Sequence, residues 1–413
     1  MEVYLVGGAV RDKLLGLPVH ERDWVVVGAR PEDLERLGYV SVGKEFPVFL
    51  HPDTKEEHAL ARLERKVAPG YRGFTTQFSP EVTLEEDLKR RDLTINAIAE
   101  KPSGELVDPY GGRRDLQAKV LRHVSEAFIE DPVRILRLAR FAARFAELGF
   151  TVAEETRVLM KRMVASGEVD ALVPERVWQE TERALGEARP DTFFQTLRDC
   201  GALKVMFPEV DALYGVPQPV KWHPEVDTGI HVMLALRYSA KIGAPTSVRY
   251  GVLTHDLGKA LTPQDVLPSH RGHEEAGVPL VEALSERLRV PNHFKELAVL
   301  AARHHPVVHR AAELNPGTLL KLFEATDAFR RPERFSEMLL VCESDARGRT
   351  GLEDSPYPQV PYLQRARDAA AAVQLPAADR AGLKGPEIGE KIRALRLAAV
   401  TRIKKDFGAR QAR

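Results

Sequence analysis

The hydrophobic pattern changes once along the chain, near residue 115, and this change limits the possible folds more than any other feature. Before it, short apolar runs at residues 3–6, 24–27 and 47–50 alternate with helical segments, which is typical of an α/β domain. From Asp115 onward, apolar residues recur every three or four positions between Gly and Pro breaks, which predicts helices almost to the end. We therefore expect an α/β head followed by a mostly α-helical body.

Within the head, the pattern predicts helices over residues 9–15 and 84–99 and a turn at 108–112. The run at 24–27 is apolar without alternation, which indicates a strand that is buried on both faces. Residues 66–78 contain Pro, Gly and a Thr pair, and we expect them to form a mobile loop.

The composition indicates the cellular compartment in which such a chain functions. Only two cysteines, Cys200 and Cys342, occur among 413 residues, which excludes a disulfide framework and a thiolate zinc site and indicates a reducing compartment. No apolar run approaches the roughly 18 residues of a membrane helix. The first residues run straight into a predicted strand without a basic, cleavable leader. We expect a cytoplasmic protein without a membrane partner.

The formal net charge is zero, with 60 basic and 60 acidic residues, which at first argues against a nucleic-acid partner. This average conceals local concentrations of positive charge, including residues 384–413, where nine basic residues face three acidic ones. A solvated terminal helix is the simpler interpretation of that surplus, and RNA contact is the functional one. A neutral total is compatible with modest, salt-sensitive and reversible RNA binding.

Two motifs of the head suit a nucleoside triphosphate and a metal ion. Gly7 and Gly8 separate the first predicted strand from a helix, where free backbone N–H groups accept phosphate, and Arg11 adds positive charge. Glu21 and Asp23 lie on one face of the next strand. Paired carboxylates repel each other unless a cation lies between them, and Mg²⁺ prefers such oxygen ligands. Taken singly, the glycine pair is a common turn, and the carboxylate pair is more simply a solvated strand end.

Two further motifs are rich in arginine. They are Arg-Arg-Asp-Leu-Thr-Ile-Asn-Ala at 90–97 and Glu-Asp-Pro-Val-Arg-Ile-Leu-Arg-Leu-Ala-Arg-Phe at 130–141. In the second, Pro132 fits the first position of a helix and Asp131 its N-cap. Arg134, Arg137 and Arg140 then share one side of that helix, where their mutual repulsion calls for anions across them. Alone, this motif is most simply a capped helix with a solvated basic stripe.

In this order and at this spacing, the motifs resemble the class II tRNA nucleotidyltransferase and poly(A) polymerase family of the polymerase-β-like superfamily. The resemblance includes Gly-Gly-x-x-Arg, the carboxylate pair, Arg-Arg-Asp-x-Thr-x-Asn-Ala, Asp-Pro-x-Gly-Gly and Glu-Asp-Pro-x-Arg-x-Leu-Arg. It is closest to the bacterial CCA-adding enzymes that carry a C-terminal HD phosphohydrolase domain, and it extends over the length of the chain.

The resemblance implies a role for each motif. Nucleotide-binding roles are implied for Gly8, Arg11, Arg91, Asp131, Arg134, Arg137 and Arg140. As a protein template, the Asp131 carboxylate would accept the amino hydrogens of cytosine N4 or adenine N6, and the Arg134 guanidinium would donate to the adjacent ring nitrogen. Uracil and guanine present a carbonyl oxygen there, so CTP and ATP would be accepted and UTP and GTP rejected. The 66–78 loop would help to switch between the two nucleotides.

The resemblance also implies that Glu21 and Asp23 hold catalytic Mg²⁺. The family usually has Asp at both positions, and Glu21 is one methylene longer while keeping the oxygen ligands. A third carboxylate is expected from a neighbouring strand, and Glu57 is our candidate.

A histidine-rich segment carries a second set of candidate ligands. The adjacent pair in His255-Asp256-Leu257-Gly258-Lys259 is expected to lie on a helix, and with His231 before it and Asp345 far downstream the motif resembles the HD phosphohydrolase superfamily. We expect His231, His255, Asp256 and Asp345 to bind a divalent transition metal, with Ni²⁺ as one candidate, and to activate water for attack on a phosphate ester.

The roles of the remaining histidines are less defined. For His273 and His305, three roles stay open: supporting the metal ligands, contacting phosphate or binding a second ion. His304 and His309 are expected to be ordinary surface or core residues.

We place the domain boundaries at 1–115 for the nucleotidyltransferase head, 116–222 for a helical nucleotide-selection and RNA-binding neck, 223–350 for the HD domain and 351–413 for a helical tail.

The expected activity is addition of CCA to the tRNA 3′ end from CTP and ATP with release of pyrophosphate. The HD domain implies 2′,3′-cyclic phosphodiesterase, 2′-nucleotidase and phosphatase activities. The expected partners are tRNA, CTP and ATP, with a monomer or homodimer as the assembly.

Other functions remain open at this stage. A poly(A) polymerase with the same head would consume ATP alone. An HD phosphohydrolase whose head is impaired by Glu21 and only binds RNA would hydrolyse cyclic phosphates without incorporating nucleotides. A non-catalytic RNA-binding scaffold would do neither.

Overall fold

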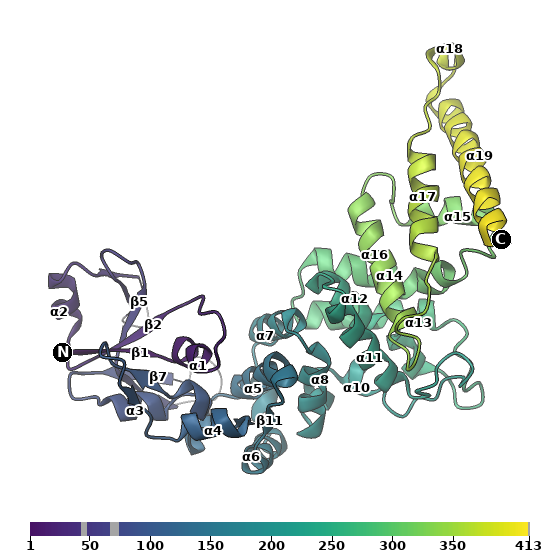
Figure 1. Ribbon diagram of the computed structural model, residues 1–413. Helices are drawn as coiled ribbons and strands as arrows, with labels where there is room; N and C mark the ends of the chain where they lie inside the picture. The colour runs from purple at the N-terminus through teal and green to yellow at the C-terminus, as the bar shows by residue number, and fades with distance from the viewer. Residues whose placement is uncertain (43–47, 67–73, 412–413) are drawn as a thin grey trace. The chain divides into compact units, whose positions relative to one another are not determined.

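A computed structural model describes residues 1–42, 48–66 and 74–411 (Figure 1). The chain forms two compact units, Met1–Met206 and Phe207–Arg413. The expected α/β head and mostly helical body are confirmed. Among the described residues, no helix has both the length and the apolar character needed to span a bilayer.

A mixed seven-stranded sheet forms the head, with strand order β3-β4-β5-β2-β1-β8-β9. Its strands are β1 (Glu2–Val6), β2 (Asp23–Val27), β3 (Val40–Ser41), β4 (Val48–Leu50), β5 (Glu57–Leu60), β8 (Ala99–Glu100) and β9 (Leu106–Val107). β2 pairs antiparallel with β1 and parallel with β5, so the ends of these three central strands meet at one edge.

Both faces of this sheet are covered. Val25 packs with Leu88 of α3 (Leu84–Lys89) on one face, and Val26 packs with Leu34 of α2 (Pro31–Arg36) on the other. Because successive strand residues point to opposite faces, the unbroken apolar run of β2 is explained by burial on both sides. A rigid central strand thereby carries Asp23 at its first position.

Two local predictions in the head were wrong. The helix expected over 84–99 ends at Lys89 and is followed by a 3₁₀ turn, Thr94–Asn96, and by β8. Leu93 forms a β-bridge with His123 instead, and the Asp92 carboxylate accepts a hydrogen bond from the Leu93 N–H, which holds the chain out of helical geometry. The tertiary contact therefore outweighs the local propensity.

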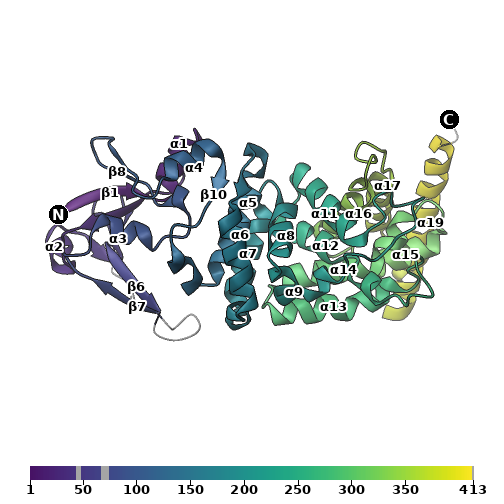
Figure 2. The same cartoon turned by 90° about the horizontal axis from the view of Figure 1, so that it is seen from below.

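Part of the expected 66–78 loop is regular structure. β6 (Arg62–Lys66) and β7 (Phe74–Phe78) pair antiparallel as a ribbon separate from the main sheet (Figure 2). Residues 67–73 of the predicted loop lie outside the described residues.

The remainder of the first unit is helical apart from one pair of short parallel strands, β10 (Val120–Leu121) and β11 (Thr151–Val152). Its helices are α1 (Gly8–Leu14), α4 (Gly112–Ala118), α5 (Val133–Phe145), α6 (Glu154–Ala165), α7 (Pro174–Gly186), α8 (Pro190–Asp199) and α9 (Ala202–Met206). α5 packs against α7 and α8 and directs one side toward the head cavity described below.

In the second unit, α11 (Thr228–Lys241), α12 (Thr246–Thr254), α14 (Asn292–His309) and α16 (Pro332–Arg347) pack around a common core. α13 (His273–Arg287) lies against α14. The remaining helices are α10 (Pro208–Asp211), α15 (Pro316–Ala325), α17 (Gln359–Ala371), α18 (Ala377–Arg380) and α19 (Gly385–Gln411). α17 and α19 lie side by side, with α18 where the chain turns between them (Figure 1).

Candidate active sites

A cavity of about 750 Å³ in the first unit brings together the residues of the head and of the following segment that the sequence predicted to bind the nucleotide or Mg²⁺. Its lining includes Gly8, Arg11, Glu21, Asp23, Glu57, Arg91, Asp131, Arg134, Arg137 and Arg140. These residues come from separate strands and loops and from α1 and α5, and only the tertiary fold places them together. The cavity is large enough for a nucleotide and is lined by both acidic and basic groups.

Three carboxylates meet at one edge of the sheet. Asp23 begins β2 and lies opposite Glu57 of the parallel neighbour β5, while Glu21 precedes Asp23 by two residues. Burial and the adjacent Glu21 carboxylate raise the pKa of Asp23, whereas the Arg91 guanidinium opposes this effect. Three oxygen donors that repel one another on an accessible edge form a donor set suited to a hard divalent cation such as Mg²⁺.

The glycine turn after β1 allows an arginine to approach the backbone closely. Gly7 has a φ of 69°, and a Cβ there would lie 2.9 Å from Arg91 Nη1. Arg11, one turn into α1, is buried, and its Nη1 donates to Asn96 Oδ1 at 2.6 Å while its Nε donates to Asp12 Oδ1 at 2.8 Å. A non-glycine side chain at residue 7 would be strained and would also displace Arg91.

The arginines of α5 are bound by the protein rather than left in solvent. Arg137 Nε donates to Asp92 Oδ2 at 2.8 Å, and Arg140 Nε donates to Glu180 Oε2 at 2.8 Å. Arg134 donates to the backbone carbonyls of Ala127 and Arg90, each at 2.7 Å. The anions that the sequence required across this face are therefore partly supplied by the chain itself, and the solvated basic stripe does not occur.

Asp131 lies at the entrance to α5 but makes a contact that the sequence did not predict. Its carboxylate accepts a hydrogen bond from the Val133 N–H at 3.1 Å, so it still caps the helix, although Pro132 occupies the cap position rather than the first helical one. Arg176 of α7 binds the same carboxylate, with 3.0 Å between Arg176 Nη2 and Asp131 Oδ2. In the free protein, both proposed template residues thus have protein partners.

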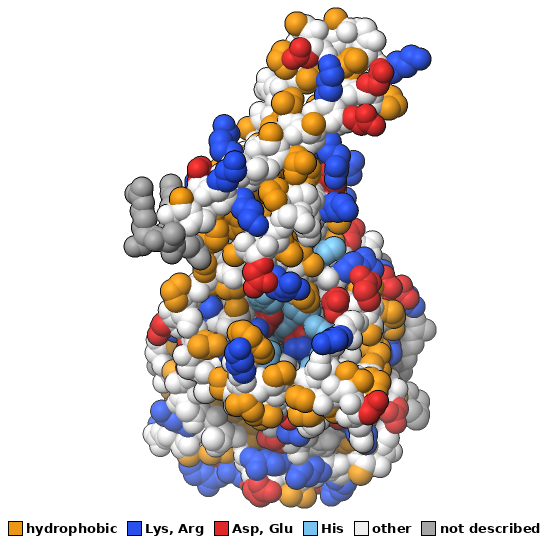
Figure 3. Space-filling model, turned by 90° about the vertical axis from the view of Figure 1, so that its right-hand side faces the viewer, with side chains coloured by type: hydrophobic (Ala, Val, Ile, Leu, Met, Phe, Trp, Pro, Cys, Tyr) orange, Lys and Arg blue, Asp and Glu red, His pale blue; other side chains and the backbone are white. Residues whose placement is uncertain are grey.

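A second cavity, of about 860 Å³, lies in the second unit, where histidine side chains gather in a hollow (Figure 3). Beside it, the four predicted ligands meet, from α11, from the end of α12 and from α16. His231 Nε2 lies 3.1 Å from Asp345 Oδ1, and His255 Nε2 lies 3.2 Å from Asp256 Oδ2. His255 Nε2 also lies 3.6 Å from Asp345 Oδ2. The four groups are buried and form a single cluster.

The donor atoms of this cluster fit a transition metal. Among the described residues, His255 Nε2 and both oxygens of Asp256 are buried without a hydrogen bond. Burial alone would lower the pKa of His255, but the carboxylates of Asp256 and Asp345 raise it above its ordinary value. Burial would raise the pKa of Asp256, but His255 and Lys259 hold it well below its usual range. Imidazole nitrogens and carboxylate oxygens without hydrogen bonds are the ligand types of such a metal.

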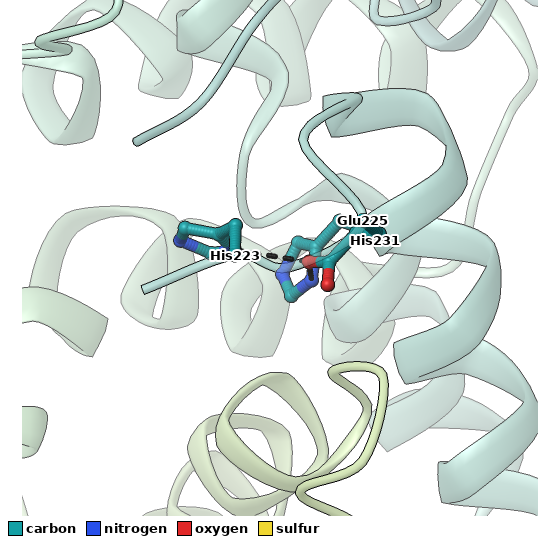
Figure 4. Close-up of side chains that lie close together, drawn as sticks. All are labelled: His223, Glu225 and His231. Atoms are coloured by element: carbon teal, nitrogen blue, oxygen red, sulfur yellow. Dashed lines mark hydrogen bonds and ion pairs between the residues drawn. The ribbon is translucent and has the colours of Figure 1, made fainter. Parts of the chain in front are cut away.

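The sequence missed a carboxylate that supports this cluster. Glu225 Oε1 lies 2.9 Å from His231 Nδ1 and 3.1 Å from His223 Nδ1, so one oxygen contacts both rings (Figure 4). The contact leaves His231 Nε2 to face Asp345. The side chain of Glu225 is 2% exposed, and hydrogen bonding to His223 and His231 lowers its pKa against the opposing effect of burial. The sequence signal was a glutamate between two histidines eight residues apart.

Two other predictions about this site were wrong. His309, expected to be an ordinary surface or core residue, has its Nε2 2.6 Å from Asp345 Oδ2, because α14 and α16 pack together. His255 and Asp256 do not lie within one helix, since α12 ends at Thr254 and Asp256 precedes a 3₁₀ turn, Leu257–Leu261.

Basic groups that carried no predicted role neutralise the cluster. Lys259 Nζ lies 2.7 Å from Asp256 Oδ2, and Arg349 Nη2 donates to Asp345 Oδ1 at 3.0 Å. Both side chains also line the cavity, where an anionic substrate would meet them.

His273 and His305 lie beside the cluster. The two Nε2 atoms are 3.1 Å apart, and burial lowers the pKa of His305 to about 4. His304 is half-buried and belongs to none of the metal-type groups among the described residues.

Family models match three parts of the chain. The Poly A polymerase head domain matches residues 3–122, the probable RNA and SrmB-binding site of polymerase A matches 149–214, and the HD domain matches 228–342. Glu21, Asp23 and Glu57 thus fall within the match to the head model, and His231, His255 and Asp256 fall within the match to the HD model.

Curated relatives match almost the whole chain. The multifunctional CCA protein of Thioalkalivibrio sulfidiphilus is 62% identical over 408 residues, covering 99% of this chain and 100% of the relative. That of Alkalilimnicola ehrlichii is 60% identical over 407 residues, covering 98% of each.

Solved structures share the fold. A CCA-adding enzyme in its second apo form gives a TM-score of 0.67 at 22% identity, over 99% of this chain and 91% of the other. The CCA-adding enzyme of Thermotoga maritima, solved with tRNA, gives 0.61 at 21% identity over the same shares of the chains.

Proposed function

The chain belongs to the family of multifunctional CCA proteins, and from this premise we propose that it adds C, C and A to the 3′ end of tRNA, using CTP and ATP. The observation that carries the proposal is the convergence of Glu21, Asp23 and Glu57 with the predicted nucleotide-binding arginines in a single cavity. Carboxylates alone would suit many metal sites, and arginines alone many phosphate sites. The combination suits nucleotidyl transfer.

In this proposal the tRNA 3′-oxygen attacks the α-phosphorus, the bond to the β-phosphate oxygen breaks, and pyrophosphate leaves. Glu21, Asp23 and Glu57 would hold Mg²⁺, which supplies positive charge to the triphosphate and acidifies the attacking hydroxyl. Arg11 and the backbone at Gly8 would orient the phosphates. Arg137 and Arg140 lie on the cavity face of α5, where they would contact the nucleotide.

Base selection is assigned to Asp131 and Arg134 because both line the cavity and offer complementary hydrogen-bonding groups. To read a base, Asp131 must share or release Arg176, and Arg134 must turn from the carbonyls of Ala127 and Arg90. The helical remainder of the chain would hold the acceptor arm of tRNA by shape and phosphate charge.

The test uses tRNA transcripts that end before CCA, after the first C or after CC. Each is incubated with Mg²⁺ and labelled CTP or ATP. The proposal predicts CTP incorporation on the first two transcripts and ATP incorporation on the third. A poly(A) polymerase would instead extend every transcript with ATP, and absence of all incorporation would favour a head that only binds RNA.

The second proposed activity is metal-dependent phosphohydrolysis in the HD domain, on 2′,3′-cyclic phosphates, 2′-nucleotides and phosphomonoesters. Its support is the cluster of His231, His255, Asp256 and Asp345 beside a cavity that Lys259 and Arg349 line. The preferred ion would be a transition metal such as Ni²⁺. Hydrolysis of a 2′,3′-cyclic nucleotide after loading with Ni²⁺, Co²⁺ or Mn²⁺ tests this activity independently of nucleotide addition.

A further inference from the structure

Trp222 lies exposed on the lining of the histidine-rich cavity. It is 58% exposed, the most exposed of the three tryptophans of the chain, and it lines the cavity of about 860 Å³ in the second unit. A single exposed apolar residue needs no explanation by itself. This ring, however, shares its cavity with the basic groups Lys259 and Arg349, beside the proposed metal cluster.

Two contacts tie the turn that carries Trp222 to the metal cluster. Arg349 donates from Nη1 to the Trp222 carbonyl at 3.2 Å and from Nη2 to Asp345 Oδ1 at 3.0 Å. The next residue, His223, has its Nδ1 3.1 Å from Glu225 Oε1, the oxygen that also contacts a ring of the cluster. Because both contacts lead to the cluster, the backbone of Trp222 keeps a fixed position relative to the groups that would bind a phosphate.

A lysine covers part of the Trp222 ring. Lys221 Nζ lies 4.6 Å from the centroid of the ring, in a cation–π contact. The ring stays 58% exposed with this lysine in place, so most of it is accessible to a ligand. Lys221 also places positive charge next to the ring, which favours a ligand that is both aromatic and anionic.

Gln218 contributes an unused hydrogen-bond donor to the same cavity. Gln218 is 2% exposed and lines the cavity, and its Oε1 accepts a hydrogen bond from Lys259 Nζ at 2.6 Å. Its Nε2 is buried and has no hydrogen-bond partner within the part of the chain that the structure describes. A buried donor without a partner is costly, so the cavity suits a ligand that brings an acceptor oxygen or nitrogen.

We propose that Trp222 forms a base-stacking subsite of the HD cavity, so that the preferred substrates are phosphate esters that carry a nucleobase. The inference rests on the proposed phosphohydrolase activity of that cavity. The base would lie on the Trp222 ring while its phosphate meets Lys259 and Arg349. Stacking accepts any base, since every base has a π-face, and this suits an enzyme that selects nucleotides without reading their sequence.

The test compares two phosphate monoesters of secondary alcohols, adenosine 2′-phosphate and glycerol 2-phosphate, of which only the first carries a base. Both are hydrolysed by the full-length protein loaded with Ni²⁺. In Trp222→Ala we expect the ratio of the two kcat/KM values to fall about ten-fold, mainly through KM for adenosine 2′-phosphate. Trp222→Phe keeps an aromatic ring and should restore most of the preference.

Val220→Ala is the matched control. It shortens a 66% exposed side chain of the same turn that lies outside the described lining of the cavity, and it should keep the wild-type ratio. An unchanged ratio in Trp222→Ala, with or without a general loss of activity, would overturn the subsite. The melting temperature shows that each variant folds.

A binding measurement separates this inference from the proposed function. Titration of the metal-free protein with adenosine 2′-phosphate should quench tryptophan fluorescence with a saturating phase that Trp222→Phe lacks. The same phase in both proteins would overturn the subsite. Absence of hydrolysis of both esters by the metal-loaded wild type would overturn the proposed hydrolase, whereas the quenching result would still test the stacking.

An oligoribonucleotide that ends in a 2′-phosphate distinguishes two sources of the base. If its hydrolysis falls in Trp222→Ala together with that of adenosine 2′-phosphate, the subsite accepts the ends of RNA chains. If the mononucleotide alone depends on Trp222, the subsite serves free nucleotides. If neither substrate depends on Trp222, stacking on this ring is refuted.

Discussion

Arg176 binds the carboxylate of Asp131 at the head cavity, with 3.0 Å between Arg176 Nη2 and Asp131 Oδ2 and 3.3 Å between Nη1 and Oδ1. Both side chains are partly exposed, so the pair contributes little to stability. Its consequence is geometric, because a two-point contact fixes the plane of the carboxylate that we assign to base recognition. Arg176 would thus determine how Asp131 faces the nucleotide.

Replacing Arg176 by Gln should therefore impair base selection more than folding. We expect kcat/KM for CTP and ATP to fall about ten-fold, equivalent to about 1.4 kcal/mol of transition-state stabilisation. The preference over UTP and GTP should narrow, since a freely rotating carboxylate orients its acceptors less well. Arg162→Gln, which removes an exposed pair with Glu126 in the same unit, serves as the control. Unchanged selectivity in Arg176→Gln would contradict the positioning role.

The two cavities should lose their activities independently. Asp23→Ala removes a proposed Mg²⁺ ligand and should cost several kcal/mol of transition-state stabilisation. At about 1.4 kcal/mol per factor of ten, CCA addition should be at least a hundred-fold slower. Its phosphodiesterase activity should remain. Asp256→Ala should show the reverse pattern, and both assays are run on each purified variant. If either variant loses both activities while its melting temperature is unchanged, the two sites are not independent.

The parts of the head that the sequence predicted well are those set by local pattern. The unbroken apolar run of β2 required burial on both faces, and the structure buries both Val25 and Val26. The site residues were predicted because their motifs resemble a family. Composition alone gave no sign that Glu57 would lie opposite Asp23, which depends on the parallel register of β2 and β5.

The features that were missed depend on contacts between residues far apart in the sequence. Arg176 lies 45 residues from Asp131, and α7 brings it there through packing. The break in the predicted 84–99 helix comes from the Leu93–His123 bridge. His309 joins Asp345 because α14 packs on α16. Local patterns contain no signal for such pairs, since any arginine or histidine on a helix could occupy them.

The pair of Asp92 and Arg137 should link acid conditions to the stability of the first unit. Burial would raise the pKa of Asp92, but the Arg137 guanidinium and the Asn96 amide hold that pKa well below its usual range. A carboxylate whose pKa is lowered on folding stabilises the folded state above its unfolded pKa of about 3.9. This contribution is then lost as the pH falls toward the lower folded pKa.

Asp92→Asn should accordingly destabilise the first unit at pH 7. Breaking a buried pair costs about 3–5 kcal/mol, and because the Arg137 side chain is 36% exposed, we expect about 2 kcal/mol after solvent screening. For a unit of this size, that corresponds to a melting temperature lower by about 4–8 °C. Calorimetry from pH 7 down to pH 3.5 should show the difference from wild type shrinking below about pH 4. A difference that stays constant with pH would contradict the linkage.

Glu225 should control metal binding without being a ligand itself. Its Oε1 lies 2.9 Å from His231 Nδ1, and this ion pair orients the ring with Nε2 toward Asp345 and makes that nitrogen a stronger metal donor. Glu225→Gln keeps a similar shape but removes the charge, and changes to such supporting groups typically weaken metal affinity about 10–100-fold. Isothermal titration of the full-length protein with Ni²⁺ measures this loss directly. Glu296→Gln, in an exposed pair with Arg331 in the same unit, should leave the affinity unchanged. A Ni²⁺ affinity equal to wild type in Glu225→Gln would show that Glu225 only packs against His231. CCA addition should remain normal in both variants, because both substitutions lie outside the first unit.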